Sequence, residues 1–368
     1  MPQHDLARLF DFAPAGRTLD ELDTPVPVID LQVVARNIAR WQTRCDALGI
    51  ANRPHIKTHK LVPLARAQIA AGAKGVTVQK LGEAEVMADA GIGDLLLTFN
   101  VLGQAKLGRL AALAQRTDIA VVMDNDVVAE AVAWAGQAAG RPIRVLIETD
   151  TGAGRCGVQS PAAALSLARK IANTQGLMLG GLMTYPKTGG RAQAAAFLSE
   201  AIALLRKDGL PVDAISTGGT PEMWRDDGLD GATEYRAGTY IYNDRSLIAG
   251  GSCSEADCAL TVLATVVSRP TPERAMIDAG SKALTSDLLG LSGYGCLQGA
   301  PEAVVYNLSE EHGFVDVSKL AAPPRIGDRV RVVPNHVCPV SNLFDRVVIV
   351  DGDTVLGSVR VDARGMVT

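Results

Sequence analysis

Short apolar runs alternate with longer segments of helical period from residue 25 to about residue 220. The apolar runs are rich in Val, Ile and Leu, which is typical of strands covered on both faces. They lie at 26–30, 53–57, 76–79, 95–99, 120–124, 144–150, 179–185 and 214–219. Strands that alternate with helical segments in this way predict βα units around a parallel sheet.

The segments between these runs are amphipathic. In 31–48 the apolar residues recur every three or four positions and so share one helical face: Leu31, Val34, Ile38, Trp41, Cys45 and Leu48. Eight such units predict a TIM-like (β/α)8 barrel, in which the working residues come from the C-terminal ends of the strands and the loops after them. Polar residues stand at five of these ends: Lys57, Gln79, Asp150, Tyr185 and Thr217.

The alternation stops after Asp244, and the remaining runs are short and β-like. They lie at 259–268, 274–278, 329–333, 346–350 and 354–360, and a Gly- and Ser-rich stretch occupies 281–300. The sequence therefore predicts a smaller, mostly β C-terminal domain after the barrel. The expected ranges are 1–24 for an N-terminal segment packed with the β domain, 25–249 for the barrel and 250–368 for the β domain.

Composition narrows the class of protein. Of the 368 residues, 47% are hydrophobic and 21% are charged, as in folded globular proteins. A formal net charge of -4 without a basic stripe argues against nucleic acid as a partner. No apolar run reaches about 18 residues and the N-terminus lacks signal-peptide features, so we expect no membrane segment and a cytoplasmic location. The six cysteines are too dispersed for a disulfide framework.

Lys57 is the leading candidate for a catalytic amine. A lysine at the end of a barrel strand can be desolvated, which lowers the pKa of its ammonium and makes the amine a nucleophile able to form a Schiff base. His55 and Lys57 alternate on a predicted strand, so we expect both side chains on one face. A lysine without such context is more often a solvated surface charge, and Lys60 is the competing candidate.

Two glycine-rich segments follow predicted strands. In 148–158 the glycines allow a loop that can hold Arg155 at the barrel mouth, where it could bind an anion or a phenolate. In 216–220 the backbone N–H groups around Gly218 and Gly219 could cradle one phosphate. Each segment taken alone is also compatible with an ordinary turn.

The segment Pro334-Asn335-His336-Val337-Cys338 places an imidazole and a thiol two residues apart. On an extended strand both side chains share a face and can reach one ion. A nitrogen and sulfur pair favours zinc over magnesium, and two protein ligands leave room for water or substrate, as in a catalytic site. His-x-Cys alone is also frequent by chance.

These segments, in this order and with this strand-helix alternation, resemble the fold-type III pyridoxal-phosphate enzymes, in which an alanine-racemase-like barrel precedes a β domain. The resemblance covers nearly the whole chain. Three segments look like the narrower group of D-threonine aldolase and D-serine dehydratase: RPHIKTHK (53–60), TVQKLGEAE (77–85) and PNHVC (334–338). The resemblance implies a homodimer that acts on D-amino acids.

The resemblance also assigns cofactor-binding roles. Lys57 would carry pyridoxal 5'-phosphate (PLP), Arg155 would lie beside the phenolic oxygen of the ring, and Arg236 would face the ring nitrogen. The phosphate is expected to lie against small residues and hydroxyls: Thr217, Gly218, Gly219, Gly238 and Thr239. The other expected cofactor-binding residues are His55, Gln79, Tyr185 and Tyr240.

An arginine that faces the ring nitrogen discourages protonation of the ring and leaves it a weaker electron sink, so a metal ion would help. His336 and Cys338 resemble the divalent metal site of the group, which implies zinc or manganese, with magnesium as a further candidate. The ion would coordinate the β-hydroxyl of the substrate. Easier deprotonation of that hydroxyl gives retro-aldol cleavage to glycine and an aldehyde, whereas its departure gives a 2-oxo acid and ammonia.

We expect retro-aldol cleavage of D-threonine-like substrates, with dehydration of D-serine or 3-hydroxy-D-aspartate as the alternative. Cys338 resembles the dehydratase branch, whereas the following segment 339–343 resembles the aldolase branch. The loop 186–191 lacks the histidine associated with aldolase base chemistry, so His59, or a hydroxide on the metal, is the expected base. An amino-acid racemase, favoured by Arg236, and a non-catalytic PLP carrier remain open as further alternatives.

Overall fold

The computed structural model describes residues 6–14, 16, 18–225 and 231–368. The chain forms two compact units that interleave in sequence. The barrel unit consists of residues 41–57, 68–238 and 366–368, and the β unit consists of residues 1–40, 58–67 and 239–365. These units differ in composition from the consecutive ranges 1–24, 25–249 and 250–368 expected from the sequence, because early segments of the chain pair with late strands.

The barrel unit contains an eight-stranded parallel sheet. In sheet order its strands are β2 (Ala51–Asn52), β9 (Glu234–Tyr235), β8 (Ala214–Thr217), β7 (Leu177–Thr184), β6 (Ile143–Thr149), β5 (Asp118–Met123), β4 (Asp94–Leu97) and β3 (Val76–Val78). The two ends of the sheet meet, since Lys74 N–H donates to Asn52 O (2.9 Å) and Thr77 N–H donates to Pro54 O (2.8 Å). The predicted TIM-like architecture with a following β domain is confirmed.

The strand at 26–30 forms as predicted but does not belong to the barrel. As β1 (Val26–Asp30) it pairs antiparallel with β10 (Leu260–Thr271) and parallel with β16 (Arg346–Asp351). Its apolar run is buried in either arrangement, so the sequence pattern could not choose between the two sheets. The eighth barrel strand is instead β9, whose two residues are too short to give a periodic signal.

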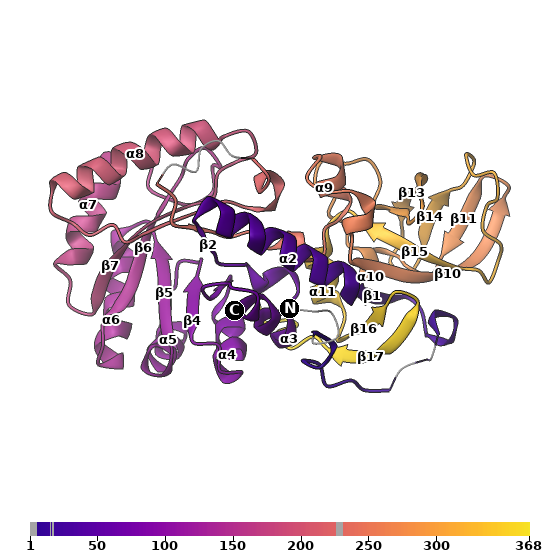
Figure 1. Cartoon of the computed structure of the whole chain (residues 1–368), viewed down its shortest axis with the longest axis horizontal. Helices are drawn as coiled ribbons and strands as arrows, with labels where there is room; N and C mark the ends of the chain where they lie inside the picture. The colour runs from indigo at the N-terminus through magenta and orange to yellow at the C-terminus, as the bar shows by residue number, and fades with distance from the viewer. Residues whose placement is uncertain (1–5, 15, 17, 226–230) are drawn as a thin grey trace. The chain divides into compact units, whose positions relative to one another are not determined.

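Helices follow most barrel strands and lie along the outside of the sheet (Figure 1). They are α3 (Val62–Ala70), α4 (Leu81–Asp89), α5 (Gln104–Arg116), α6 (Asp126–Ala139), α7 (Pro161–Ala172) and α8 (Arg191–Lys207), with the one-turn helix η3 (Thr220–Glu222) after β8. The helix α2 (Leu31–Leu48) instead follows β1 of the nine-stranded sheet. Asn125 starts α6 by accepting a hydrogen bond from Val128 N–H (3.0 Å), and the left-handed Gly140 ends it. Among the described residues, no helix combines the length and apolar character needed to cross a membrane.

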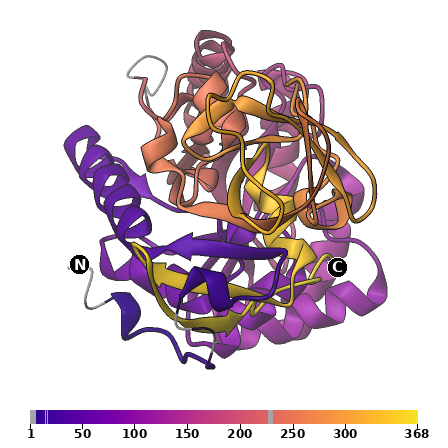
Figure 2. The same cartoon turned by 90° about the vertical axis from the view of Figure 1, so that its right-hand side faces the viewer.

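The β unit is built on a nine-stranded, mostly antiparallel sheet, and Figure 2 turns this part of the chain toward the viewer. Its further strands are β11 (Arg274–Ile277), β12 (Gly295–Leu297), β13 (Ala300–Leu308), β14 (Gly313–Asp316), β15 (Arg329–Pro334) and β17 (Thr354–Arg360). Short helices join them: η1 (Leu19–Glu21), η4 (Thr239–Ile241), α9 (Arg245–Ala249), η5 (Glu255–Asp257), α10 (Ser281–Leu284) and α11 (Val337–Leu343). The N-terminal segment lies on the sheet edge, where Ala13 pairs with Ser358 of β17.

A buried ion cluster crosses the barrel sheet at Arg53. Its guanidinium donates to Glu234 Oε2 of β9 (2.9 Å) and to both carboxylate oxygens of Asp94 of β4 (2.7 and 3.2 Å). Arg53 and Glu234 are almost fully buried. Burial raises the pKa of Glu234, but the charge and hydrogen bonds of Arg53 outweigh burial and hold it below the ordinary 4.5.

Glu234→Gln removes one charge from this cluster and should lower the free energy of unfolding by about 3 kcal/mol at pH 7, because it leaves a buried guanidinium partly uncompensated. A carboxyl whose pKa is depressed on folding stabilises the protein above its unfolded-state pKa, and this contribution is lost as the pH falls through the folded-state value. The difference in the free energy of unfolding between wild type and variant, measured by urea unfolding, should therefore shrink as the pH falls below about 4.

Glu85→Gln is the matched control. Glu85 pairs with Arg109 (2.6 Å) at a half-exposed position, so its loss should cost less than about 1 kcal/mol. Equal destabilisation by the two substitutions, or a Glu234 effect independent of pH, would contradict the assignment.

Candidate active site

Lys57 lies where the backbone leaves the barrel sheet. The chain stays paired beyond β2, since Arg53 N–H donates to Tyr235 O (2.9 Å) and His55 N–H donates to Ala237 O (3.0 Å). It then turns into the one-turn helix η2 (Ile56–Thr58), so Lys57 is not the last residue of a strand but the second of a turn. In the described part of the chain, the half-buried Lys57 side chain has no hydrogen-bond or ion-pair partner. No described side chain or carbonyl therefore holds its amine.

His55 and Gln79 lie beside the Lys57 turn and contact each other. His55 Nε2 is 3.1 Å from Gln79 Oε1, and Gln79 Nε2 donates to Thr98 O (2.9 Å). Because the amide nitrogen of Gln79 is used as a donor, its oxygen must accept, which assigns the hydrogen of His55 to Nε2. The buried His55 ring is thus held in one orientation and lies under the turn that carries Lys57.

The turn after β8 has the properties of an anion cradle. Gly218 adopts a left-handed backbone (φ +89°), and a Cβ at this position would collide with the ring of Tyr235. Tyr235 in turn donates its hydroxyl to Gly219 O (2.9 Å). The backbone N–H groups of Gly218 and Gly219 have no acceptor among the described residues. Two free donors beside Thr217 fit a phosphate.

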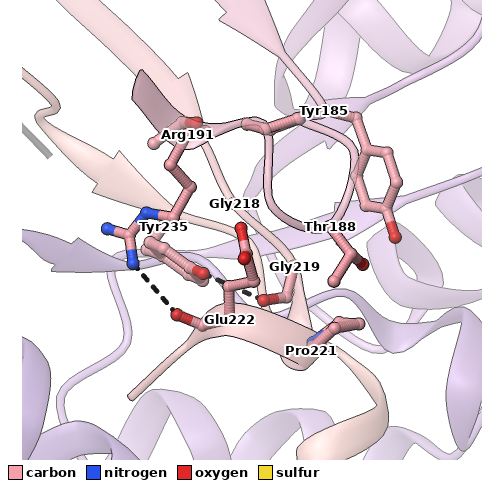
Figure 3. Close-up of a pocket in the computed structure, with 10 residues that line it drawn as sticks. Tyr185, Thr188, Arg191, Gly218, Gly219, Pro221, Glu222 and Tyr235 are labelled. Atoms are coloured by element: carbon pink, nitrogen blue, oxygen red, sulfur yellow. Dashed lines mark hydrogen bonds between the residues drawn. The ribbon is translucent and has the colours of Figure 1, made fainter. Parts of the chain in front are cut away.

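A small pocket opens over this turn (Figure 3). Tyr185, Thr188, Arg191 and Glu222 line it together with the two glycines. Arg191 is buried and donates Nη1 to Glu222 O (3.1 Å). Arg191 was not predicted from the sequence, because loop 186–191 carries no motif and differs from the aldolase pattern only by the histidine it lacks. A buried guanidinium beside free N–H groups makes the pocket favourable for an anion.

Arg155 lies in a loop above β6, next to Tyr185. Its guanidinium is 3.6 Å from Glu148 Oε1 and lies over the Tyr185 ring, 5.2 Å from the centroid. Burial raises the pKa of Glu148, while Arg155 and Arg236 oppose that shift. Glu148, a buried carboxyl not singled out from the sequence, is thus the counter-ion of Arg155. The Arg155 side chain remains 55% exposed and accessible to a ligand.

Arg236 follows β9 and is buried inside the barrel unit. It donates Nη1 to Ser216 Oγ (2.7 Å) and Nη2 to Thr184 O (2.7 Å). Burial lowers the pKa of Arg236 to about 10, against the opposing charges of Glu234 and Glu148. The guanidinium therefore stays charged at neutral pH and can act only as a donor.

Gly238, predicted to contact phosphate, already donates its N–H to Thr220 Oγ1 (3.2 Å). Thr239 and Tyr240 begin η4 in the β unit, where Tyr240 is buried and Thr239 Oγ1 lies 3.8 Å from Cys338 Sγ. The predicted cofactor-binding residues thus divide between the two units.

His59 also belongs to the β unit and is completely buried. Its Nδ1 accepts a hydrogen bond from Leu61 N–H (3.0 Å), and its ring meets the edge of Tyr242, 6.5 Å between centroids. The Tyr242 hydroxyl is buried and has no partner in the part of the chain that the structure describes. Burial, followed by the nearby Cys338, raises the pKa of Tyr242 well above its usual value. A buried polar atom without a partner here could be satisfied by a bound group.

His336 and Cys338 do not lie on the extended strand expected from the sequence, because the chain turns into α11 after β15 ends at Pro334. His336 precedes α11 as its N-cap and Cys338 is the second residue of the helix. The two side chains are still within hydrogen-bonding reach of each other. Thr58 Oγ1 lies 3.1 Å from Cys338 Sγ, and His336 Nδ1 lies 2.6 Å from Asp287 Oδ2. Burial favours neutral imidazole, but Cys338 and then Asp287 raise the pKa of His336 to about 9. No cluster of three or more His, Cys, Asp or Glu suited to a metal occurs in the described ranges, so the pair alone supplies candidate ligands.

The chain is similar in sequence to known protein families and enzymes. The chain matches the alanine racemase N-terminal domain over residues 29–246 and a putative serine dehydratase domain over residues 259–350. It is 35% identical to a D-threonine aldolase of Arthrobacter sp. (96% of each chain covered). It is 37% identical to the D-threo-3-hydroxyaspartate dehydratase of Delftia sp. strain HT23 (89% of this chain and 94% of the relative).

Solved structures show the same architecture. The D-threonine aldolase of Filomicrobium marinum superimposes with a TM-score of 0.90 at 33% identity, covering 97% of this chain and all of that one. A cysteine-to-alanine mutant of D-threo-3-hydroxyaspartate dehydratase in the metal-free form superimposes with a TM-score of 0.86 at 34% identity, covering 94% of this chain and 99% of that one. Domain match, sequence identity and superposition agree, and the chain belongs to the family of the alanine racemase N-terminal domain.

Proposed function

We propose that this protein is a PLP- and divalent-metal-dependent lyase that acts on D-3-hydroxy amino acids. The observation that carries the proposal is the Lys57 amine, which has no partner among the described residues and lies in the turn after β2, in a unit where the N–H groups of Gly218 and Gly219 also lack described acceptors. The relatives named above act on substrates of this class. The expected partners are D-amino acid substrates, and the homodimer stays a prediction.

The residues of the barrel unit fit PLP. Gly218 and Gly219, with Thr217, would hold the phosphate, and Arg191 would add positive charge beside it. Lys57 would hold the aldehyde carbon, Arg155 the phenolic oxygen and Arg236 the ring nitrogen. When bound, PLP supplies an electron sink for charge that develops at the α-carbon of the substrate.

Arg236 limits this sink. A guanidinium that stays charged could donate a hydrogen bond to the ring nitrogen of bound PLP but could not accept one, so it would keep that nitrogen unprotonated. Charge stabilisation must then come from elsewhere in the site. His336 and Cys338 would hold a divalent ion, and the donor set favours zinc, with manganese as the second candidate. Such an ion supplies Lewis acidity at the substrate hydroxyl.

His59 is the residue proposed to move the substrate proton. Because Nδ1 accepts from Leu61 N–H, the hydrogen of the neutral ring is on Nε2, so the neutral ring can donate a proton from Nε2 but cannot accept one there. This favours His59 as a proton donor over the base role expected from the sequence. The Tyr242 ring at the edge of His59 restricts the imidazole to this orientation. The Tyr242 hydroxyl has no hydrogen-bond partner in the described chain, so a polar group bound beside it could form a hydrogen bond with it.

Retro-aldol cleavage to glycine and an aldehyde is the first candidate reaction. It is supported by the D-threonine aldolases, one of which superimposes along almost the whole chain. Dehydration to a 2-oxo acid and ammonia is the second, and Cys338 favours it, since a thiol ligand resembles the dehydratase branch. The sequence identity to the Delftia dehydratase is similar to that with the aldolase.

Lys57→Ala should remove the visible absorbance of the lysine-bound cofactor, together with turnover. Borohydride reduction of the wild type followed by peptide mass spectrometry should place the modification on Lys57. Lys60→Met is the discriminating control, because Lys60 Nζ is occupied by Ala363 O (3.3 Å) and the variant should keep the absorbance. A reduced adduct on Lys60, or none on either lysine, would sink the cofactor assignment.

His336→Ala, Cys338→Ala and treatment with a chelator should each lower turnover of D-threonine and of D-threo-3-hydroxyaspartate by roughly 100-fold or more, since each removes Lewis acid assistance at the hydroxyl. The visible absorbance of the cofactor should persist in all three. Simultaneous assay of glycine and ammonia identifies the reaction: glycine supports cleavage and ammonia supports dehydration. Full turnover after chelation would exclude the metal, and loss of optical activity alone would indicate a racemase.

A further inference from the structure

Asp287 contacts His336 but has no part in the proposed function so far. Its Oδ2 lies 2.6 Å from His336 Nδ1, and the two side chains are 37% and 24% exposed, so solvent screens the contact only in part. A carboxylate can only accept a hydrogen bond, so Nδ1 must carry the hydrogen and donate it. The nitrogen of His336 that remains for an ion is Nε2.

The Asp287 carboxylate is itself held in place. Asp287 N–H donates to Thr285 Oγ1 (3.1 Å), and Leu289 N–H donates to Asp287 Oδ1 (3.4 Å). The second oxygen, Oδ2, is thereby left for His336. Thr285 and Leu289 both have left-handed backbone (φ 66° and 45°), which is costly for such residues and persists only where the surroundings impose it.

The loop 285–293 is hydrogen-bonded to Asn335, the residue that precedes His336. The buried side chain of Asn335 donates Nδ2 to Gly293 O (2.7 Å) and to Leu288 O (3.3 Å). Arg245 Nη1 donates to Asn335 Oδ1 (3.1 Å) and to Ser292 O (2.7 Å), which closes the network. Asp287 and His336 are therefore positioned relative to each other by the protein itself.

We infer that Asp287 is a positioning residue of the metal site, which fixes the tautomer and direction of His336 and so strengthens the binding of a divalent cation by His336 and Cys338. The inference rests on the metal pair of the proposed function and adds to it a residue that acts through His336. Metal-binding histidines commonly donate their second nitrogen to a carboxylate, and loss of that partner weakens metal affinity by roughly 10- to 100-fold.

The test is the zinc affinity of the full-length protein, measured by competition with a chromophoric chelator. Asp287→Ala should weaken zinc binding by roughly 10- to 100-fold. Asp287→Asn should fall between this variant and the wild type, because the amide oxygen still accepts from Nδ1 but carries no charge. Asp345→Asn is the control: Asp345 pairs with Arg364 (3.3 Å) in the same unit, is 74% exposed, and should leave affinity unchanged.

Two further measurements distinguish a positioning role of Asp287 from a structural role and from the absence of a metal site. They are the zinc affinity of His336→Ala and the unfolding midpoints of the metal-free proteins. Zinc uptake that is lost in His336→Ala but unchanged in both Asp287 variants overturns the inference and leaves the proposed function intact. A wild type that takes up no zinc or manganese overturns the metal part of the proposed function, and this inference with it. An affinity loss confined to Asp287→Ala, with a matching drop in its metal-free unfolding midpoint, would mean a structural role and also overturns it.

Discussion

The position of Lys57 depends on the buried Arg53, four residues before it in the chain. Its guanidinium joins β9 through Glu234 and β4 through Asp94, while Thr77 Oγ1 donates to its carbonyl (3.0 Å). The side chain and the backbone carbonyl of Arg53 thus bind residues of three barrel strands, β9, β4 and β3. Buried charges are tolerated only when they are paired in this way, so the cluster fixes where the chain leaves the sheet and where the Lys57 turn begins.

The sequence predicted the architecture because periodicity survives wherever an element is long. Strands such as 120–124 and 144–150, and helix 31–48, gave clear apolar patterns and formed close to the expected positions. The partner of a strand has no such local signal. The run at 26–30 is a strand in either sheet, and only its pairing with residues more than 200 positions away decides which one it joins. The two-residue β9 carries no periodic pattern and is recognised only from its pairing with β2 and β8 in the folded chain.

The candidate site was predictable where its residues are contiguous in sequence and not where they are brought together by the fold. Lys57, the glycines after β8 and the His-x-Cys pair each lie in a short motif. Arg191, Glu148 and Asp287 do not, because each acts on a group that is distant in sequence: Asp287 lies 49 positions before His336. A carboxylate in a Gly- and Ser-rich stretch carries no local signal of the imidazole it will meet.

The distribution of charge argues for the kind of ligand the barrel unit binds. Three of its arginines have carboxylate or carbonyl partners: Arg53 has Glu234 and Asp94, Arg155 has Glu148, and Arg236 has the Thr184 carbonyl. Lys57 and the N–H groups of Gly218 and Gly219 have none among the described residues. Unsatisfied donors are costly unless a ligand completes them. One molecule could complete both the Lys57 amine and the glycine N–H groups if it had a carbonyl carbon for the amine and a phosphate for the glycines. Arg155 and Arg236 would then orient a ring that joins these two groups of the ligand.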